Sequence, residues 1–319
     1  MGSVEQQVPS HPVLIVGATA VGKSDLAVEL ALRWAGEVVN ADSMQLYRGM
    51  DIGTAKLTSS ERRGVPHHLL DVWDVRRVAS VADYQILADD VLADLAARHR
   101  PAVVVGGSGL YLRALLGDLA FPGTDPALRA RLEREQEEHG AAALHARLAA
   151  RDPEAAATIQ ASNLRRVVRA LEVVELTGRP FRLSMASYAA VDAMQVGLTV
   201  PRPVLDERIE RRVERMWERG FVDEVRRLAS AGLREGVTAR RALGYAQVLR
   251  HLAGTGSEDE ARAETVRATR RFVRRQETWF HRDPRVVWLD ATEDDEPIDV
   301  RRLADRVTSV VFGRSAVPD

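Results

Sequence analysis

The sequence predicts an α/β fold in which a mostly parallel β-sheet carries helices on both faces and a helical unit is inserted into the chain. Three observations predict it. Short apolar runs alternate with helical patterns over the first third of the chain, a glycine-rich turn follows the first run, and a strand-free segment rich in Ala, Leu, Arg and Glu interrupts the alternation. Strands that alternate with helices form parallel sheets, whose ligands bind at the carboxyl ends of the strands.

The first part of the core, residues 1–122, is expected to hold the start of that sheet. Its predicted strands are residues 13–17, 37–40, 68–72 and 102–106, where short apolar runs are typical of buried strands. Its predicted helices are residues 23–34, 81–98 and 110–116, where apolar side chains recur with helical spacing.

A helical insertion is expected over residues 123–193, because helical spacing without a strand pattern runs from Asp125 to about Thr177. Residues 194–319 then return to the core, beginning with a strand at 194–200. After this strand we expect helices at residues 203–231, 239–253 and 258–281, a strand at 285–290, and a closing helix at 298–311.

The composition limits the possible chemistry. A chain of 319 residues with 45% hydrophobic content is long enough for one large core and a smaller second unit. The absence of cysteine excludes disulfides and Cys-ligated metals, and the eight histidines include no HxxxH-type metal pair, so a metal would be an oxygen-bound cation such as Mg²⁺. We find no signal peptide and no apolar run that would span a membrane, so we expect a cytoplasmic protein. We also expect a monomer, although the sequence does not fix the oligomeric state.

The first motif is a phosphate-binding loop of the form GxxxxGKS between a predicted strand and a predicted helix. In such a loop the backbone N–H groups and the helix N-terminus face an anion, the lysine reaches the outer phosphate, and the serine hydroxyl binds Mg²⁺. The motif therefore predicts a P-loop NTPase-like core, with Ser24 as the magnesium ligand. The loop residues are Gly17, Ala18, Thr19, Ala20, Val21, Gly22, Lys23 and Ser24.

A carboxylate that would support nucleotide hydrolysis is not evident. An NTPase needs an acidic residue after an apolar strand to hold Mg²⁺ and position water. The most apolar partner strand ends in Gly106-Gly107-Ser108, and the substitutes are Asp71 and Asp290, either of which reads equally as an ordinary residue at a strand end. We therefore expect the bound phosphates to be held as a leaving group.

A second polar cluster follows the predicted strand 37–40. Asp42 stands at the carboxyl edge where the phosphate loop also opens, which is a position for a general base, although a turn or a helix cap also explains it. Ser43, Gln45, Tyr47 and the downstream Lys56 add polar groups nearby. Ser108 can offer a hydroxyl to a bridging oxygen or cap the next helix.

These motifs together resemble the tRNA dimethylallyltransferases of bacteria. The resemblance rests on "GATAVGKS", "NADSMQLYRGMDIGTAKL", "VVVGGSGLYLRALL", "NLRRVVRALEV", "ERIERRVERMWERGFVDEV", "ALGY" and "RRQETWF", in the family's order over residues 12–290. One departure is Ser108, where the family commonly has threonine. The resemblance implies transfer of a dimethylallyl group from dimethylallyl diphosphate to N6 of the adenosine 3′ of the anticodon, position 37, with release of diphosphate. It also implies a tRNA anticodon stem-loop as the partner.

The resemblance further implies roles for individual residues. The catalytic set is Asp42, which takes the N6 proton, Ser108, which contacts the bridging oxygen, and the cations Lys23 and Arg208. Arg208 and Arg212 join the phosphate loop in binding the diphosphate, although salt bridges to Glu207 or Glu214 are an alternative. The residues implied to bind tRNA are Asp42, Ser43, Met44, Gln45, Ser108, Arg129, Arg165, Arg166, Arg169, Arg241, Gly244, Tyr245, Arg275, Gln276 and Trp279. Solvated helix faces for these arginines, and a core position for Trp279, are the alternatives.

Three other functions remain open at this point. A free-adenylate isopentenyltransferase would share the loop and the base but has little use for an arginine-rich insertion. A small-molecule P-loop kinase would use the insertion as a lid and would transfer phosphate from ATP. A non-catalytic RNA-binding protein with a vestigial loop would turn over no donor.

Overall fold

The computed structural model describes residues 8–117, 123–181, 193–293, 296–297 and 299–313. It divides into two compact units, one formed by residues 1–115 with 191–319 and one by residues 116–190. The expected insertion, residues 123–193, falls within a few residues of the second unit. Each unit has its own hydrophobic core and is described separately.

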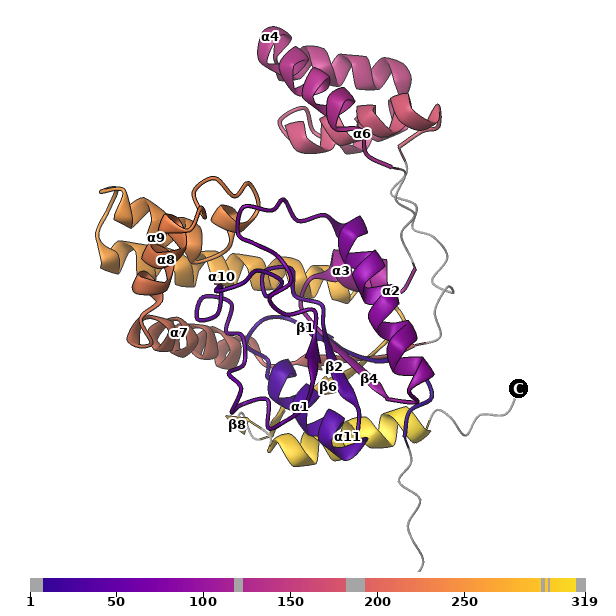
Figure 1. Cartoon of the computed structure of the whole chain (residues 1–319), viewed down its shortest axis with the longest axis vertical. Helices are drawn as coiled ribbons and strands as arrows, with labels where there is room; N and C mark the ends of the chain where they lie inside the picture. The colour runs from indigo at the N-terminus through magenta and orange to yellow at the C-terminus, as the bar shows by residue number, and fades with distance from the viewer. Residues whose placement is uncertain (1–7, 118–122, 182–192, 294–295, 298, 314–319) are drawn as a thin grey trace, which may run out of the picture. The chain divides into compact units, whose positions relative to one another are not determined.

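The first unit is built on a six-stranded, all-parallel sheet in the order β3-β2-β4-β1-β5-β6 (Figure 1). Its strands are β1 (Val13–Gly17), β2 (Glu37–Asn40), β3 (His67–His68), β4 (Ala102–Val105), β5 (Met194–Thr199) and β6 (Val286–Asp290). Consecutive β1 residues such as Leu14 and Ile15 are both buried, so both faces of the sheet are covered. The predicted α/β class is confirmed.

Helices cover this sheet and extend from its carboxyl edge. The helix α1 packs against α11, and α2 contacts β2 and packs against α3 (Figure 1). The helices of this unit are α1 (Lys23–Arg33), α2 (Val81–Ala97), α3 (Gly109–Leu115), α7 (Arg202–Glu218), α8 (Phe221–Ser230), α9 (Tyr245–Leu252), α10 (Glu258–Phe280) and α11 (Val300–Gly313), with a 3₁₀ turn η1 at Ala239–Arg241. A separate antiparallel pair joins β7 (Thr292–Glu293) and β8 (Glu296–Pro297).

Backbone conformation explains where the observed elements differ from the expected ones. The strand expected at 68–72 ends at His68, because Leu69 and Asp71 have φ of 60° and 57°, outside the range of a strand. The single helix expected at 203–231 is two helices, since Gly220 has φ 85° between α7 and α8. The helix expected at 239–253 is likewise divided before α9.

The second unit is helical, as expected. Its helices are α4 (Pro126–Arg151), α5 (Pro153–Thr158) and α6 (Leu164–Thr177), and Gly140, with φ 83°, kinks α4. Leu132, Leu144 and Leu148 of α4 pack with residues of α6. Proline at the first position of α4 and α5, each after a capping aspartate, explains why both helices begin where they do.

Candidate active site

The phosphate-binding loop has the conformation that its sequence predicts. It leaves β1 at Gly17, where a Cβ atom would lie 2.7 Å from the backbone oxygen of Leu198, and it enters α1 after Gly22, which has φ 96°. The loop thus ends at a helix N-terminus, whose unpaired N–H groups favour an anion. The backbone N–H of Thr19 donates to the Oε1 of Gln276 on α10 at 3.0 Å, which fixes the middle of the loop.

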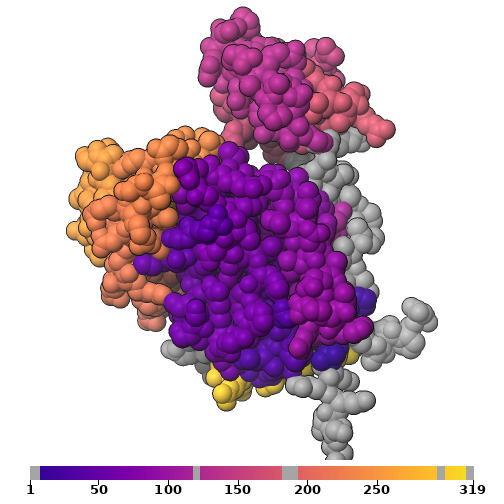
Figure 2. Space-filling view, viewed as in Figure 1, coloured from indigo at the N-terminus to yellow at the C-terminus, as the bar shows by residue number. Residues whose placement is uncertain are grey.

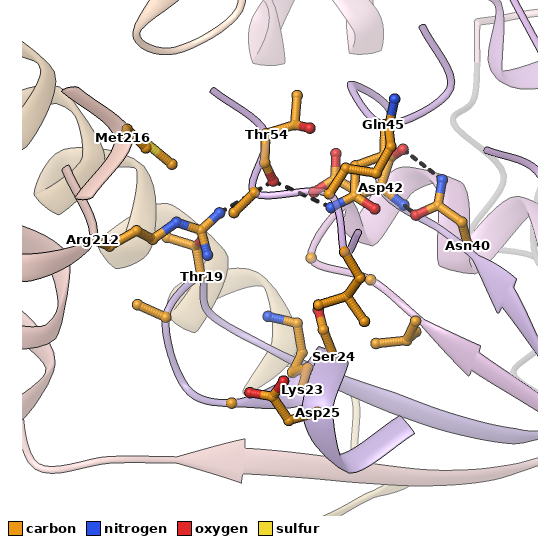
Figure 3. A pocket seen from close by; sticks show the side chains of 18 of the residues that line it. Thr19, Lys23, Ser24, Asp25, Asn40, Asp42, Gln45, Thr54, Arg212 and Met216 are labelled. Atoms are coloured by element: carbon orange, nitrogen blue, oxygen red, sulfur yellow. Dashed lines mark hydrogen bonds between the residues drawn. The ribbon is translucent and has the colours of Figure 1, made fainter. Parts of the chain in front are cut away.

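The loop opens into a pocket of about 360 Å³ at the carboxyl ends of β1, β2 and β4 (Figure 3). The pocket has a basic side formed by Lys23 and by arginines of α7. The α7 arginines that line it are Arg208, Arg212 and Arg215, and Arg219 lines it from the residue that follows the helix. Carboxylates of Asp25, Asp42 and Glu61 also line it. This composition suits a ligand that carries several negative charges and a bound cation.

Burial makes the charges of this pocket costly in the absence of an anion. Burial, together with the neighbouring charge of Arg212, lowers the pKa of Lys23 to about 7, and the charge of Asp42 opposes that shift. Burial also lowers the pKa of Arg212. The Nζ of Lys23 donates to the backbone oxygen of Ala18, and the Nη2 of Arg212 donates to that of Thr54 at 3.2 Å. An anion between these two cations would favour the charged form of both.

Asp42 lies across the pocket from Arg212, with Lys23 below and between them in Figure 3. Its Oδ1 accepts the backbone N–H of Met44 at 2.9 Å, and its own N–H donates to the Oδ1 of Asn40 at 3.0 Å. Asn40 is buried and also donates to the backbone oxygens of Asp42 and Leu69, both at 3.0 Å. The Asp42 carboxylate is therefore held in place at the end of β2 while its side chain lines the pocket.

Ser108 joins the loop after β4 to the polar cluster after β2. Its Oγ accepts the backbone N–H of Ser43 at 3.2 Å and donates to the Oγ of Ser43 at 3.3 Å. Its backbone oxygen accepts the N–H groups of Tyr111 and Leu112, so Ser108 also begins α3. Ser108 thus precedes α3, as expected, and its contact with a bridging oxygen stays a prediction.

The acidic residues that sequence reasoning offered for nucleotide hydrolysis lie outside this pocket. Asp71 accepts Lys56 Nζ at 2.6 Å, and Asp290 accepts the N–H and hydroxyl of Thr292. Where β4 ends, Val105, Gly106 and Gly107 line the pocket and bring no carboxylate. This part of the site therefore lacks the acid that an NTPase places after this strand.

Two pocket carboxylates were not foreseen. Asp25 follows Ser24 directly in the first turn of α1, a signal that the sequence did contain, whereas Glu61 lies in a loop without any such signal. Burial and the nearby charge of Glu61 raise the pKa of Asp25. Both carboxylates line the same pocket as Ser24, so the site contains oxygen donors of the kind that Mg²⁺ prefers.

Arg208 and Arg212 of α7 are the predicted diphosphate contacts, with salt bridges to Glu207 or Glu214 as the alternative. Glu207 pairs with Arg211, while Arg208 and Arg212 line the pocket one helical turn apart. Both side chains therefore lie where a contact with the diphosphate requires them.

Two residues predicted to bind tRNA, Tyr245 and Gln276, have buried side chains with hydrogen bonds inside the protein. Tyr245 is fully buried, and its hydroxyl donates to the Oε1 of Glu224 at 2.6 Å. Gln276 is 6% exposed and joins two loops, since its Oε1 accepts Thr19 N–H and its Nε2 donates to the Gly107 oxygen at 2.8 Å. A buried phenol bonded to a buried carboxylate offers nothing to an RNA, so the prediction for Tyr245 is wrong. Gln276 also lines the pocket, so its contact with tRNA stays a prediction. Gly244 is also buried, at the start of α9.

Trp279 is 39% exposed, so the alternative of a core position is excluded. Its ring lies over Gly109, whose Cβ, if present, would be 2.0 Å from the Nε1 of Trp279. The guanidinium of Arg113 lies 5.9 Å from the centre of this ring. Arg241 and Arg275 are exposed, as a phosphate contact requires. Met44 and Gln45 are partly buried beside Asp42, and Gln45 donates to the Thr54 oxygen at 3.2 Å.

The predicted tRNA-binding arginines of the second unit divide into two pairs. Arg129 and Arg169 both pair with Glu172, a fully buried carboxylate, at 2.6 and 2.7 Å. Arg165 and Arg166 are exposed on α6 and form no ion pair within the described part of the chain. The first pair therefore stabilises the unit, and the second pair is better placed to contact a partner.

The fold and the site define the class of protein. An all-parallel sheet, a glycine-rich loop leading into α1 and a basic pocket at the carboxyl ends of the strands are the features of a P-loop protein that binds the phosphates of its ligand. No helix in the described residues has the length and apolar character needed to cross a membrane.

Comparison with known proteins identifies the family. Residues 45–283 match the model of the family described as IPP transferase. The tRNA dimethylallyltransferase of Thermobifida fusca is 62% identical over 312 residues, 96% of each chain, and that of Streptomyces coelicolor is 62% identical over 293 residues, 92% of this chain and 94% of the relative. The chain therefore belongs to the IPP transferase family, which confirms the predicted family and the transferase class.

Solved structures of related proteins support the same family. The full-length tRNA isopentenylpyrophosphate transferase of Bacillus halodurans is 40% identical with a TM-score of 0.69, and the match covers 96% of this chain and 98% of that one. A eukaryotic dimethylallyltransferase acting on tRNA has a TM-score of 0.80 at 24% identity and covers 95% of this chain and 79% of its own. The second match shows a common fold.

Proposed function

We propose that this chain transfers a dimethylallyl group from dimethylallyl diphosphate to N6 of the adenosine 3′ of the anticodon, position 37, in tRNA and releases diphosphate. The observation that carries the proposal is one pocket that brings Lys23 and Arg212 together with Asp42, without a carboxylate after β4. The names of the relatives support the same activity. The donor, the target adenosine and the residue roles below are parts of this proposal.

The reaction requires a departing diphosphate and the removal of a proton. The lone pair of the adenine N6 amine is delocalised into the ring, so N6 is a poor nucleophile, and the allylic C1–O bond must break to a large extent as N6 approaches. Catalysis then consists of stabilising charge on the diphosphate while a base accepts the proton. The pocket has cations on one side and a carboxylate on the other, as this division of work demands.

Individual side chains take the following roles. Lys23, the loop N–H groups, Arg208 and Arg212 hold the diphosphate. The Ser108 hydroxyl, which follows the pocket-lining residues Gly106 and Gly107, donates to the bridging oxygen in place of Ser43 Oγ. The C1–O bond breaks with its electron pair on the diphosphate, the N6–C1 bond forms, and Asp42 takes the proton from N6. Excluding water from this pocket protects the allylic centre from hydrolysis.

Magnesium fits the oxygen donors of the site. The Ser24 hydroxyl with the Asp25 and Glu61 carboxylates would hold it, and Mg²⁺ usually binds through one or two carboxylates plus substrate phosphates. When bound, the ion supplies positive charge to the leaving diphosphate. Removing it with a chelator is expected to suppress transfer.

The target base must leave the stack of the anticodon loop to reach Asp42, and enzymes that modify a base pay for that step through contacts to the flanking backbone. Exposed cations contribute such contacts without reading sequence. Arg165 and Arg166 supply them from the second unit, and Arg241, Arg275 and Trp279 supply them from the first.

One incubation tests the proposed function. The protein is mixed with Mg²⁺, dimethylallyl diphosphate and unmodified tRNA, and the tRNA nucleosides are examined by mass spectrometry. A gain of C5H8 on a single adenosine is expected. A parallel reaction with AMP in place of tRNA is expected to give no product; a gain on AMP alone would support a free-adenylate isopentenyltransferase, and no gain on either acceptor would contradict the proposal.

Changing Arg165 and Arg166 together to alanine is expected to weaken tRNA binding and to reduce its salt dependence. Each lost phosphate contact lowers the slope of log K against log salt by up to about one. The affinity for dimethylallyl diphosphate is expected to stay unchanged. Binding titrations across a series of salt concentrations measure both quantities.

Arg134 and Arg151 changed to alanine provide a charge-matched control, because they are exposed arginines of the same unit that were not predicted to bind. An equal slope for the Arg165 and Arg166 variant and the unchanged protein would mean that these side chains only form a solvated surface.

A further inference from the structure

One loop forms a wall of the pocket that neither the phosphate loop nor the Asp42 cluster provides. The loop contributes Ile52, Thr54, Ala55, Lys56 and Leu57 to the pocket lining. The backbone oxygen of Thr54 accepts two hydrogen bonds across the pocket, which Figure 3 shows as dashed lines. One comes from Arg212 Nη2 and the other from Gln45 Nε2, each at 3.2 Å.

The Thr54 carbonyl therefore contacts side chains from both sides of the pocket. Arg212 belongs to the side assigned to the diphosphate, whereas Gln45 lies three residues after Asp42 on the side assigned to the acceptor base. A displacement of the Thr54 oxygen would release both side chains at once. The contacts that position this loop therefore determine how well Arg212 and Gln45 are ordered before substrate binds.

One carboxylate of α8 binds the start of this loop, in addition to the ion pairs that Lys56 forms with Asp51 and Asp71. Glu224 is 1% exposed. Its Oε2 accepts the backbone N–H groups of Asp51 at 3.1 Å and Ile52 at 2.7 Å, and its Oε1 accepts that of Gly53 at 3.2 Å. The Tyr245 hydroxyl of α9 donates to the same Oε1 at 2.6 Å. Three successive N–H groups of the loop and one hydroxyl thus converge on one buried anion.

Only a carboxylate suits this arrangement. All four partners donate, and an ionised carboxylate accepts on both oxygens, whereas a glutamine amide would turn an NH₂ group toward at least one donor. Buried hydrogen bonds to a charged group are also stronger than neutral ones. The position therefore requires the charge as well as the shape of glutamate.

Packing leaves the loop little room to relax. A Cβ atom on Gly53 would lie 2.2 Å from Phe221 and 2.5 Å from Tyr245. These two rings pack edge to face with their centres 5.0 Å apart. Helices α8 and α9, orange in Figures 1 and 2, lie directly against the indigo and purple first third of the chain. The loop thus packs against two aromatic rings and is hydrogen-bonded to Glu224.

We propose that Glu224 is a positioning residue for prenyl transfer: it fixes the loop at Asp51, Ile52 and Gly53, and through the Thr54 carbonyl it sets Arg212 and Gln45. The inference rests on the proposed function, since that function gives Arg212 and Gln45 their roles. Glu224 itself touches no substrate.

The test measures the affinity of the full-length protein for dimethylallyl diphosphate with Mg²⁺ by isothermal titration calorimetry, without tRNA. Glu224→Gln is expected to weaken this binding about tenfold, because part of the energy of a buried charged hydrogen bond is transmitted to Arg212. In an Arg212→Ala background the same substitution is expected to cost less than about twofold, because residues that act as one unit are not additive. Equal losses in both backgrounds would overturn the inference.

Two further variants keep the result interpretable. Tyr245→Phe keeps the ring that supports Gly53 and removes only the hydroxyl, so it is expected to weaken binding about threefold and decides the question if Glu224→Gln does not fold. Glu37→Gln is the matched control, because Glu37 is a buried carboxylate bonded to Arg98 and His68 at the start of β2, away from the pocket. It is expected to leave the affinity unchanged.

The result also separates this inference from the proposed function. A folded Glu224→Gln variant with unchanged affinity in the native background contradicts the positioning role, whatever the protein does to tRNA. If the unsubstituted protein fails to prenylate tRNA yet binds the diphosphate in a manner that depends on Glu224 and Arg212, the proposed function fails and the positioning role stands.

Discussion

Replacing Asp42 by asparagine is expected to lower kcat for prenyl transfer by about 10²–10⁴, because a positioned general base contributes about that much. The amide keeps an oxygen that can still accept the Met44 N–H, so the turn after β2 keeps its shape. What is lost is a group able to take the N6 proton. Single-turnover assays with saturating tRNA measure the change in rate directly.

Two controls distinguish this role from a general loss of structure. The affinity for tRNA is expected to stay within a few-fold in Asp42→Asn, since phosphate contacts supply most of that affinity. Asp290→Asn removes a carboxylate at the end of another strand, outside the pocket, and is expected to leave the rate within about twofold of the unchanged protein, as surface changes usually do. A loss below tenfold in Asp42→Asn would remove Asp42 from the base role.

The sequence predicted the features of this site that depend on neighbouring residues. The GxxxxGKS segment encodes its own conformation, because Gly17 and Gly22 adopt positive φ values that the turn requires and Lys23 begins the helix. Asp42 was predicted because it follows a strand by two residues, and carboxyl ends of parallel strands gather at one edge. Local pattern thus located both the phosphate side and the base side of the pocket.

Other features depend on contacts between distant segments, which no local pattern encodes. Glu224 meets the loop at Asp51 across 173 positions, and Gln276 meets Thr19 across 257. Tyr245 stands in a motif that resemblance assigned to tRNA, yet its burial and its bond to Glu224 assign it to the framework of the site. The sequence pattern of a helical segment does not show whether a polar side chain faces solvent or a buried partner. Only the tertiary structure distinguishes these two positions.

Lys56 is another residue whose role depends on tertiary contacts that local sequence does not show. Its sequence position after the Asp42 cluster suggested a functional cation, and it does line the pocket. Its side chain, however, is 3% exposed, and its ammonium pairs with Asp51 and Asp71 at 2.7 and 2.6 Å. The lysine therefore holds the pocket wall, while Lys23 is the cation with a lowered pKa and a phosphate-binding loop around it.

Lys23→Ala is expected to reduce prenyl transfer by about three orders of magnitude, because it removes a preorganised charge from the leaving diphosphate. Lys23→Arg is expected to recover little, since a planar guanidinium does not replace a compact ammonium within a loop shaped around one. Transfer rates of both variants, measured with saturating tRNA and dimethylallyl diphosphate, give the comparison. Transfer at the native rate in Lys23→Ala would exclude the loop from the reaction.

The same variant separates a leaving-group site from a nucleotide-hydrolysing one. ATP carries linked phosphates that the loop can admit, so ATP is expected to compete weakly with dimethylallyl diphosphate. Nothing placed after β4 directs a nucleophile at its γ-phosphate, because Gly106 and Gly107 stand there and Asp71 is paired with Lys56. Release of ADP from ATP with Mg²⁺ and tRNA is therefore expected near background, whereas a kinase would exceed about 1 s⁻¹. Robust ADP release that Lys23→Ala abolishes would overturn the assignment of this pocket to a departing diphosphate.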